Sequence, residues 1–122
     1  MDIYHVYREE TLADQIDRIY GEGSTDTLTG VIVKPIDDQN RYELPKEVAD
    51  KLIEAIKTSE KGSADIGFQD VHYFSTDHTV YFILANKLEF ALPFSSDLNY
   101  IAGMKIDQQL SQAILDNITG IN

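Results

Sequence analysis

The fold is decided by residues 68–94, which read FQDVHYFSTDHTVYFILANKLEFALPF. Aromatic and β-branched residues dominate this stretch, and two short polar breaks divide it into runs at 68–76, 79–85 and 88–94. Runs of this composition and length are typical of β-strands. We therefore predict a meander of three antiparallel strands, joined by two-residue turns at Asp77-His78 and Asn86-Lys87.

The two turns decide which side chains share a face, because side chains alternate along a strand. With these turns, one face holds an apolar set that we expect to meet the helices. Its members are Tyr81, Ile83, Ala85, Leu88, Phe90, Leu92, His72 and Phe74. The opposite face, called the second apolar face below, holds Val71, Tyr73, Val80, Phe82 and Leu84.

The second apolar face has three explanations. A helix covers it, so that the strand at 79–85 is buried on both faces. Alternatively, it is the contact surface of a homodimer or another partner, because an exposed apolar patch of this size is uncommon on a monomer. In the third case the register is shifted by one residue, which moves every side chain of a strand to the other face.

Outside the meander, short strands alternate with amphipathic helices. The expected strands lie at 3–7, 28–36 and, briefly, 41–43. Apolar residues at helical spacing predict three helices, at about 11–20, 45–59 and 105–119. In the first helix we expect Thr11 and Asp14 to form a capping box, with Ile16 and Ile19 on the apolar side. Together these elements predict one α+β domain over residues 1–122, with a mostly antiparallel sheet of about five strands packed with three helices.

Composition excludes several classes of function. The 122 residues contain no cysteine, which excludes disulfides, thiolate metal sites and cysteine nucleophiles. Ten Lys and Arg against 21 Asp and Glu give 10 − 21 = −11 at pH 7, and this charge disfavours direct binding to nucleic acid and to anionic membranes. The longest apolar run, residues 80–85, is far below the roughly 20 residues that cross a bilayer. No signal peptide is visible, so we expect a cytoplasmic protein.

The sequence shows no catalytic or metal-binding pattern. Its three histidines are His5, His72 and His78, and the last two do not converge in the predicted hairpin. Signature motifs of serine nucleophiles, zinc proteases and calcium loops are missing, and the neighbouring carboxylates Asp37 and Asp38 do not make a metal site by themselves. We therefore expect no cofactor, no metal and no enzymatic activity.

Acidic residues gather in the first 44 positions. Glu10, Asp14 and Asp17 recur at i, i+4 and i+7 on the polar side of the first predicted helix. Acidic residues of the neighbouring loops extend this area: Glu22, Asp26, Asp37 and Asp38. Such a charged area either serves solubility alone or forms a docking surface for a basic partner.

Three functions follow as hypotheses. The first is a non-enzymatic protein-binding domain, of the inhibitor, immunity or regulatory type, that presents these carboxylates to a protein partner with a basic surface. The second is an oligomeric structural or accessory protein, in which a homodimer associates through the second apolar face. The third is an enzyme or small-ligand binder that uses His72, Tyr81 and Asp70.

Overall fold

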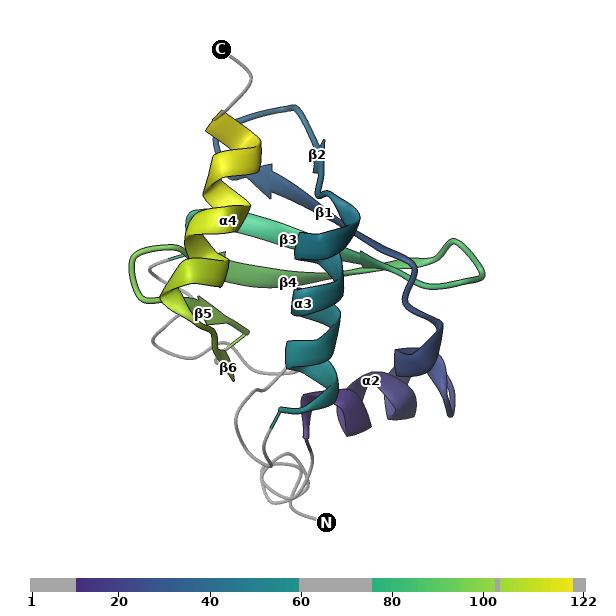
Figure 1. The fold of residues 1–122 in the computed structure, drawn as a ribbon. Helices are drawn as coiled ribbons and strands as arrows, with labels where there is room; N and C mark the ends of the chain where they lie inside the picture. The colour runs from purple at the N-terminus through teal and green to yellow at the C-terminus, as the bar shows by residue number, and fades with distance from the viewer. Residues whose placement is uncertain (1–10, 60–75, 103, 120–122) are drawn as a thin grey trace.

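The computed structural model describes residues 11–59, 76–102 and 104–119. In these residues, three α-helices accompany one antiparallel sheet of six strands (Figure 1). The elements are α2 (Leu12–Tyr20), the 3-10 helix η1 (Ser24–Thr27), β1 (Gly30–Pro35), β2 (Tyr42–Glu43), α3 (Lys46–Lys57), β3 (His78–Ile83), β4 (Glu89–Ser95), β5 (Tyr100–Ile101), β6 (Met104–Lys105) and α4 (Gln108–Thr119). The predicted α+β class is confirmed, with six strands where about five were expected.

The strands lie in the order β2-β1-β3-β4-β5-β6, and β3 pairs with β1 along one edge and with β4 along the other. β1 lies along the edge of β3 where the segment at 68–76 was expected, and it pairs with all six residues of β3. His78, expected in a turn, is the first residue of β3 and lies opposite Pro35 and Phe94. Residues 3–7 and 68–75, where two strands were expected, lie outside the described residues.

The register between β3 and β4 differs by one residue from the predicted register, and the turn is the cause. Leu84 N–H donates to the Leu88 carbonyl at 2.8 Å, and Lys87 N–H donates to the Leu84 carbonyl at 2.9 Å. The loop therefore has three residues and ends with Lys87 in the left-handed conformation (φ 71°), where a two-residue turn was expected. As a result Phe82 lies opposite Phe90, and their rings stack with centroids 5.3 Å apart.

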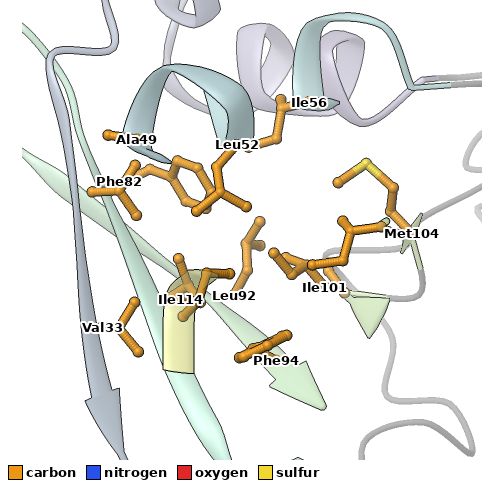
Figure 2. Close-up of a cluster of buried hydrophobic side chains, with 14 of the residues drawn as sticks. Val33, Ala49, Leu52, Ile56, Phe82, Leu92, Phe94, Ile101, Met104 and Ile114 are labelled. Atoms are coloured by element: carbon orange, nitrogen blue, oxygen red, sulfur yellow. The ribbon is translucent and has the colours of Figure 1, made fainter. Parts of the chain in front are cut away.

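This shift collects the large apolar side chains in one core between the sheet and the helices (Figure 2). Its fully buried members include Val33, Leu52, Phe82, Leu92 and Ile114. In the second apolar face, Val80, Phe82 and Leu84 are 0%, 0% and 3% exposed within this core. For these three residues the explanation that helices cover the face is confirmed, and the explanation that they form an oligomer contact is wrong. Val71 and Tyr73, its other two members, lie outside the described residues.

Alternate residues of the same strands point to the other side of the sheet. Tyr81 and Ile83, which were predicted to meet the helices, belong to this side. In Figure 1, α3 and α4 cross the opposite side, and within residues 11–59, 76–102 and 104–119 no helix lies on the side of Tyr81. We call this surface the helix-free face; its members are Ile32, Lys34, Glu43, Thr79, Tyr81, Ile83, Glu89, Ala91 and Pro93.

Local signals account for the start of α2. The Thr11 hydroxyl accepts the Asp14 N–H at 3.0 Å, and the Asp14 carboxylate accepts the Thr11 N–H at 3.2 Å. The predicted capping box is thus confirmed. The apolar side of α2 is narrower than expected, since Ile16 is buried but Ile19 is 45% exposed.

The last helix begins later than predicted. Lys105, expected at its start, instead belongs with Met104 to β6, which pairs with β5. The Asp107 carboxylate then accepts the Gln109 N–H at 3.0 Å, which caps the first turn of α4. By contrast, α3 matches the predicted helix closely and buries Val48, Ala49, Leu52 and Ile56.

Candidate functional site

The acidic residues predicted to form one area fall into two groups. Four of them lie on or between α2 and η1: Asp14, Asp17, Glu22 and Asp26. Asp37 and Asp38 follow β1, at the opposite end of the molecule in Figure 1. Glu10 lies outside the described residues. The two groups are therefore separate candidate surfaces.

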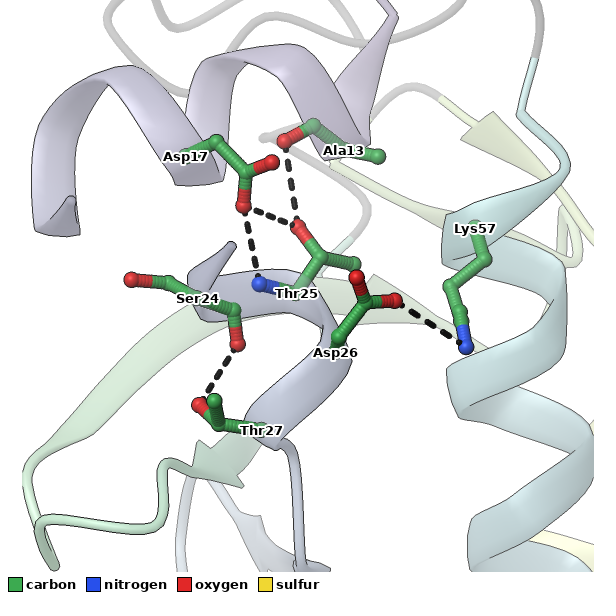
Figure 3. Close-up of polar contacts among 7 residues, drawn as sticks. All are labelled: Ala13, Asp17, Ser24, Thr25, Asp26, Thr27 and Lys57. Atoms are coloured by element: carbon green, nitrogen blue, oxygen red, sulfur yellow. Dashed lines mark hydrogen bonds and ion pairs between the residues drawn. The ribbon is translucent and has the colours of Figure 1, made fainter. Parts of the chain in front are cut away.

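Asp17 of α2 links this helix to η1 through hydrogen bonds from Thr25 (Figure 3). The N–H and the hydroxyl of Thr25 both donate to Asp17 Oδ1, at 2.8 and 2.7 Å, and the hydroxyl also lies 3.2 Å from the Ala13 carbonyl oxygen. Thr25 is only 5% exposed, so these hydrogen bonds are largely shielded from water. Asp17 thus belongs to the internal framework of this region. Helical spacing gives no signal for this contact, because it spans the loop between two elements.

The other three carboxylates of this group face solvent. Asp14, Glu22 and Asp26 are exposed, and we call them the α2–η1 acidic surface. Asp26 Oδ1 lies 3.3 Å from Lys57 Nζ of α3, with side chains 76% and 41% exposed (Figure 3). An ion pair this open to water contributes little to stability. Its carboxylate therefore stays available to an external cation.

In the second group, Asp38 shapes the connection between β1 and β2. Its Oδ1 accepts the Asn40 N–H at 2.9 Å, and its Oδ2 accepts the Tyr42 hydroxyl at 2.7 Å. The hydrogen bond from the Asn40 backbone, followed by that from Tyr42, lowers the pKa of Asp38 below its ordinary value. Asp37 beside it is exposed. This group has only two carboxylates among the described residues, and that of Asp38 already accepts hydrogen bonds from Asn40 and Tyr42.

A polar cluster that sequence patterns did not indicate joins the start of β3 to the end of β4. Asp77 Oδ1 accepts the Ser96 N–H at 3.0 Å and lies 2.9 Å from His78 Nδ1, while the Ser96 hydroxyl donates to Asp77 Oδ2. Burial raises the pKa of Asp77, but the hydrogen bonds from Ser96 and His78 outweigh it and hold the pKa below its ordinary value of 3.8. The His78 ring packs on Phe94, with centroids 5.5 Å apart.

This cluster contains the three residue types of a serine hydrolase triad in a different order. In a triad, the histidine lies between the serine and the aspartate and removes the proton from the hydroxyl. Here Asp77 lies in the middle, and Ser96 donates its proton to that carboxylate. The arrangement links the end of β4 to the start of β3 through Ser96 and Asp77. The contact depends on strand register, which explains why residue spacing did not reveal it.

Two pockets lie apart from these clusters. One of about 400 Å³ opens between the end of α3 and the start of α4, with Ser59, Lys105 and Asp107 among its lining residues. The other, of about 280 Å³, lies on the helix-free face beside Thr79 and Pro93. In the first pocket the Ser59 hydroxyl donates to the Ile56 carbonyl at 2.8 Å and accepts the Leu12 N–H at 3.1 Å, so it serves the backbone at the end of α3. Among the described residues, no three His, Cys, Asp or Glu side chains are grouped to hold a metal.

The remaining sequence-based candidates do not form a ligand site in the described part of the chain. His72 and Asp70 lie outside it, and Tyr81 points to the helix-free face, where the Arg41 guanidinium covers its ring at 4.6 Å. No helix within the described ranges is long and apolar enough to span a membrane. Comparisons with known protein families, curated proteins and solved structures find no match for the chain.

Proposed function

We propose that this protein is a non-enzymatic binding domain that presents the α2–η1 acidic surface to a protein partner with a basic surface, in the manner of an inhibitor, immunity or regulatory protein. The observation that carries the proposal is the pair of hydrogen bonds from Thr25 to Asp17, at 2.8 and 2.7 Å. They hold η1 against α2, so that the exposed carboxylates Asp14, Glu22 and Asp26 keep a fixed arrangement. A surface that is already ordered loses less conformational entropy when it binds.

The charge of the whole chain supports the same partner. A net charge of −11 attracts a cationic protein over long distances and speeds the encounter, and it repels nucleic acid. The α2–η1 region adds four carboxylates against the single guanidinium of Arg18. Association driven by such charges weakens as salt screens them. A cytoplasmic location is part of the same proposal.

The geometry of the polar cluster supports a role without catalysis. The Ser96 hydroxyl donates to Asp77 rather than to His78, so the serine–histidine contact of a hydrolase triad is not formed between these described residues. The exposed carboxylates of the α2–η1 acidic surface line neither of the pockets described above. Exposed charges of one sign are suited to contact with a macromolecule that carries the opposite charge.

Two double variants with the same total charge test this proposal. Asp14→Lys with Glu22→Lys alters the α2–η1 acidic surface, while the control, Asp97→Lys with Asp116→Lys, alters exposed carboxylates elsewhere. Each pair changes the net charge from −11 to −7. Proteins captured from a lysate by the unaltered chain at low salt, and released at high salt, are expected to be lost by the first variant and retained by the control.

Equal losses in both double variants would show that only the total charge matters and would contradict a dedicated surface. Capture that is insensitive to salt would contradict the basic partner itself. Circular dichroism of each variant at the same temperature verifies that a lost interaction does not come from a lost fold. Because the Asp14 carboxylate also accepts the Thr11 N–H in the capping box, the measurement is repeated with Asp14→Asn, which removes the charge and keeps an acceptor at this position.

A further inference from the structure

The helix-free face has a continuous apolar patch at its centre. Ile32, Tyr81 and Ala91 lie side by side across β1, β3 and β4, and Ile83 follows Tyr81 on the same side of β3. Side chains opposite one another on neighbouring strands have Cβ atoms about 5 Å apart and touch. Three of these four side chains are half-buried and Ala91 is exposed. The patch is therefore one surface.

Charged side chains lie around this patch and, in the case of Arg41, over its Tyr81 ring, and their charges sum to zero. Arg41 Nη2 lies 2.7 Å from Glu89 Oε1, and its guanidinium lies over the Tyr81 ring at 4.6 Å from the centroid. Lys34 of β1 and Glu43 of β2 also belong to this face. Among the described residues that the strand register and the Arg41 contacts place on this face, two cations and two anions sum to zero, whereas the whole chain carries −11. The helix-free face is thus a neutral surface on a strongly acidic protein.

The patch also includes a recess, which Ile36 helps to line. The pocket of about 280 Å³ is lined by Thr79, Ala91 and Pro93 of this face together with Ile36 and others. Ile36 is an apolar side chain that is 50% exposed. In a two-fold symmetric contact, each copy offers the same recess and the same surface to the other. Such an interface requires a surface that is complementary to itself.

We propose that the helix-free face binds the same face of a second copy of the chain and forms a symmetric dimer. Two molecules of charge −11 repel each other, and the repulsion is weakest where the facing surfaces carry no net charge. A basic partner is instead attracted to the carboxylates elsewhere on the chain. Across a two-fold axis, the cations Lys34 and Arg41 of each copy face a surface that carries Glu43 and Glu89, so the charged frame is self-complementary.

Sedimentation equilibrium over a series of protein concentrations tests the dimer. The unaltered chain is expected to associate, and more strongly at high salt, because screening reduces the repulsion between the two acidic bodies. Ile83→Asp buries a charge in the proposed contact and should lower the association constant about tenfold or more. The control is Ile19→Asp on α2, where the side chain is 45% exposed and lies away from the sheet; its association constant should not change.

A charge exchange provides a second, milder test that does not depend on the apolar patch. Arg41→Glu leaves each face with a charge of −2 and should weaken association, and adding Glu89→Arg returns the face to zero and should restore it. A chain that stays monomeric at every concentration overturns the proposal. Dimers that persist unchanged in folded Ile83→Asp and in Arg41→Glu overturn it as well.

The dimer and the function proposed above are tested by separate measurements. Capture of a basic partner is expected to weaken at high salt and to depend on Asp14 and Glu22, whereas the dimer is expected to strengthen at high salt and to depend on Ile83 and Arg41. Failure of one set of measurements therefore leaves the other intact.

Discussion

The two faces of the sheet differ in burial although both carry large apolar side chains. Along β3, Val80 and Phe82 are 0% exposed under the helices, while Tyr81 between them is half-buried on the helix-free face. Hydrophobicity does not distinguish the two sets. The residues opposite them on β4 do distinguish the two sets, because Phe82 lies opposite Phe90 whereas Tyr81 lies opposite the small side chain of Ala91. The difference shows that the core was selected by strand register rather than by composition alone.

The largest effect should come from a deletion on the covered face. Phe82→Ala removes a ring that is 0% exposed and stacked on Phe90, so the free energy of unfolding should fall by about 3–5 kcal/mol. Ile83→Ala, one residue along the strand on the other face, should cost less than half as much. Urea unfolding of both variants measures the difference. Equal losses would mean that both faces are core.

The next effect concerns the polar cluster at one end of β3. Asp77→Asn keeps the size of the side chain but weakens the hydrogen bonds from Ser96 and His78, so stability at neutral pH should fall by about 1–3 kcal/mol. Because the pKa of Asp77 is lowered in the folded state, its contribution is present above 3.8 and is lost as pH falls through the folded-state pKa.

Thermal unfolding from neutral to acidic pH measures this dependence. The gap between the unaltered chain and Asp77→Asn should narrow as the pH falls below 3.8. A gap that stays constant down to the acid limit would show that the ionised carboxylate is not what holds the two strands together.

A smaller change, of opposite sign, should come from the turn that sets the register. Lys87 has φ 71°, a conformation that glycine adopts without strain, so Lys87→Gly should stabilise the protein by about 1 kcal/mol. Ala85→Gly in the same loop is the control and should not stabilise, because Ala85 is not in this conformation. Chemical unfolding ranks the two variants. A loss of stability in Lys87→Gly would contradict the three-residue loop.

The smallest effect is expected on the helix-free face. Arg41→Ala removes an ion pair at 2.7 Å and the contact with the Tyr81 ring, but the Arg41 and Glu89 side chains are 43% and 34% exposed. Solvent screening limits such contacts, so the loss in monomer stability should stay below about 1 kcal/mol. Differential scanning calorimetry at low protein concentration checks this value. A larger loss would place this face in the folding core rather than at a contact surface.

Local patterns predicted the elements that depend on neighbouring residues. The Thr11–Asp14 capping box and the apolar side of α3 were found because their signals lie within a few residues of one another. Strand pairing was harder, because a turn without glycine gave no sign that Lys87 takes the left-handed conformation. Because this one loop residue was not recognised, the prediction placed Phe82 and Phe90 on opposite faces of the sheet, whereas they lie opposite each other on the same face.

The candidate site was predicted in part for the same reason. Exposure of Asp14, Glu22 and Asp26 follows from their place on polar helix positions and in a loop. The engagement of Asp17 by Thr25 and the cluster around Asp77 join residues across loops or strands, where sequence separation carries no geometric information.

Both margins of the described sheet end in strands of only two residues, β2 and β6. Strand margins this short offer few free backbone groups for another chain to add to, and on the β1 side Pro35 supplies no N–H at all. Growth of the sheet into a fibril by successive strand addition is therefore disfavoured. A second copy that binds through the helix-free face therefore adds by stacking rather than by extending the sheet, and a stack of two closes on itself.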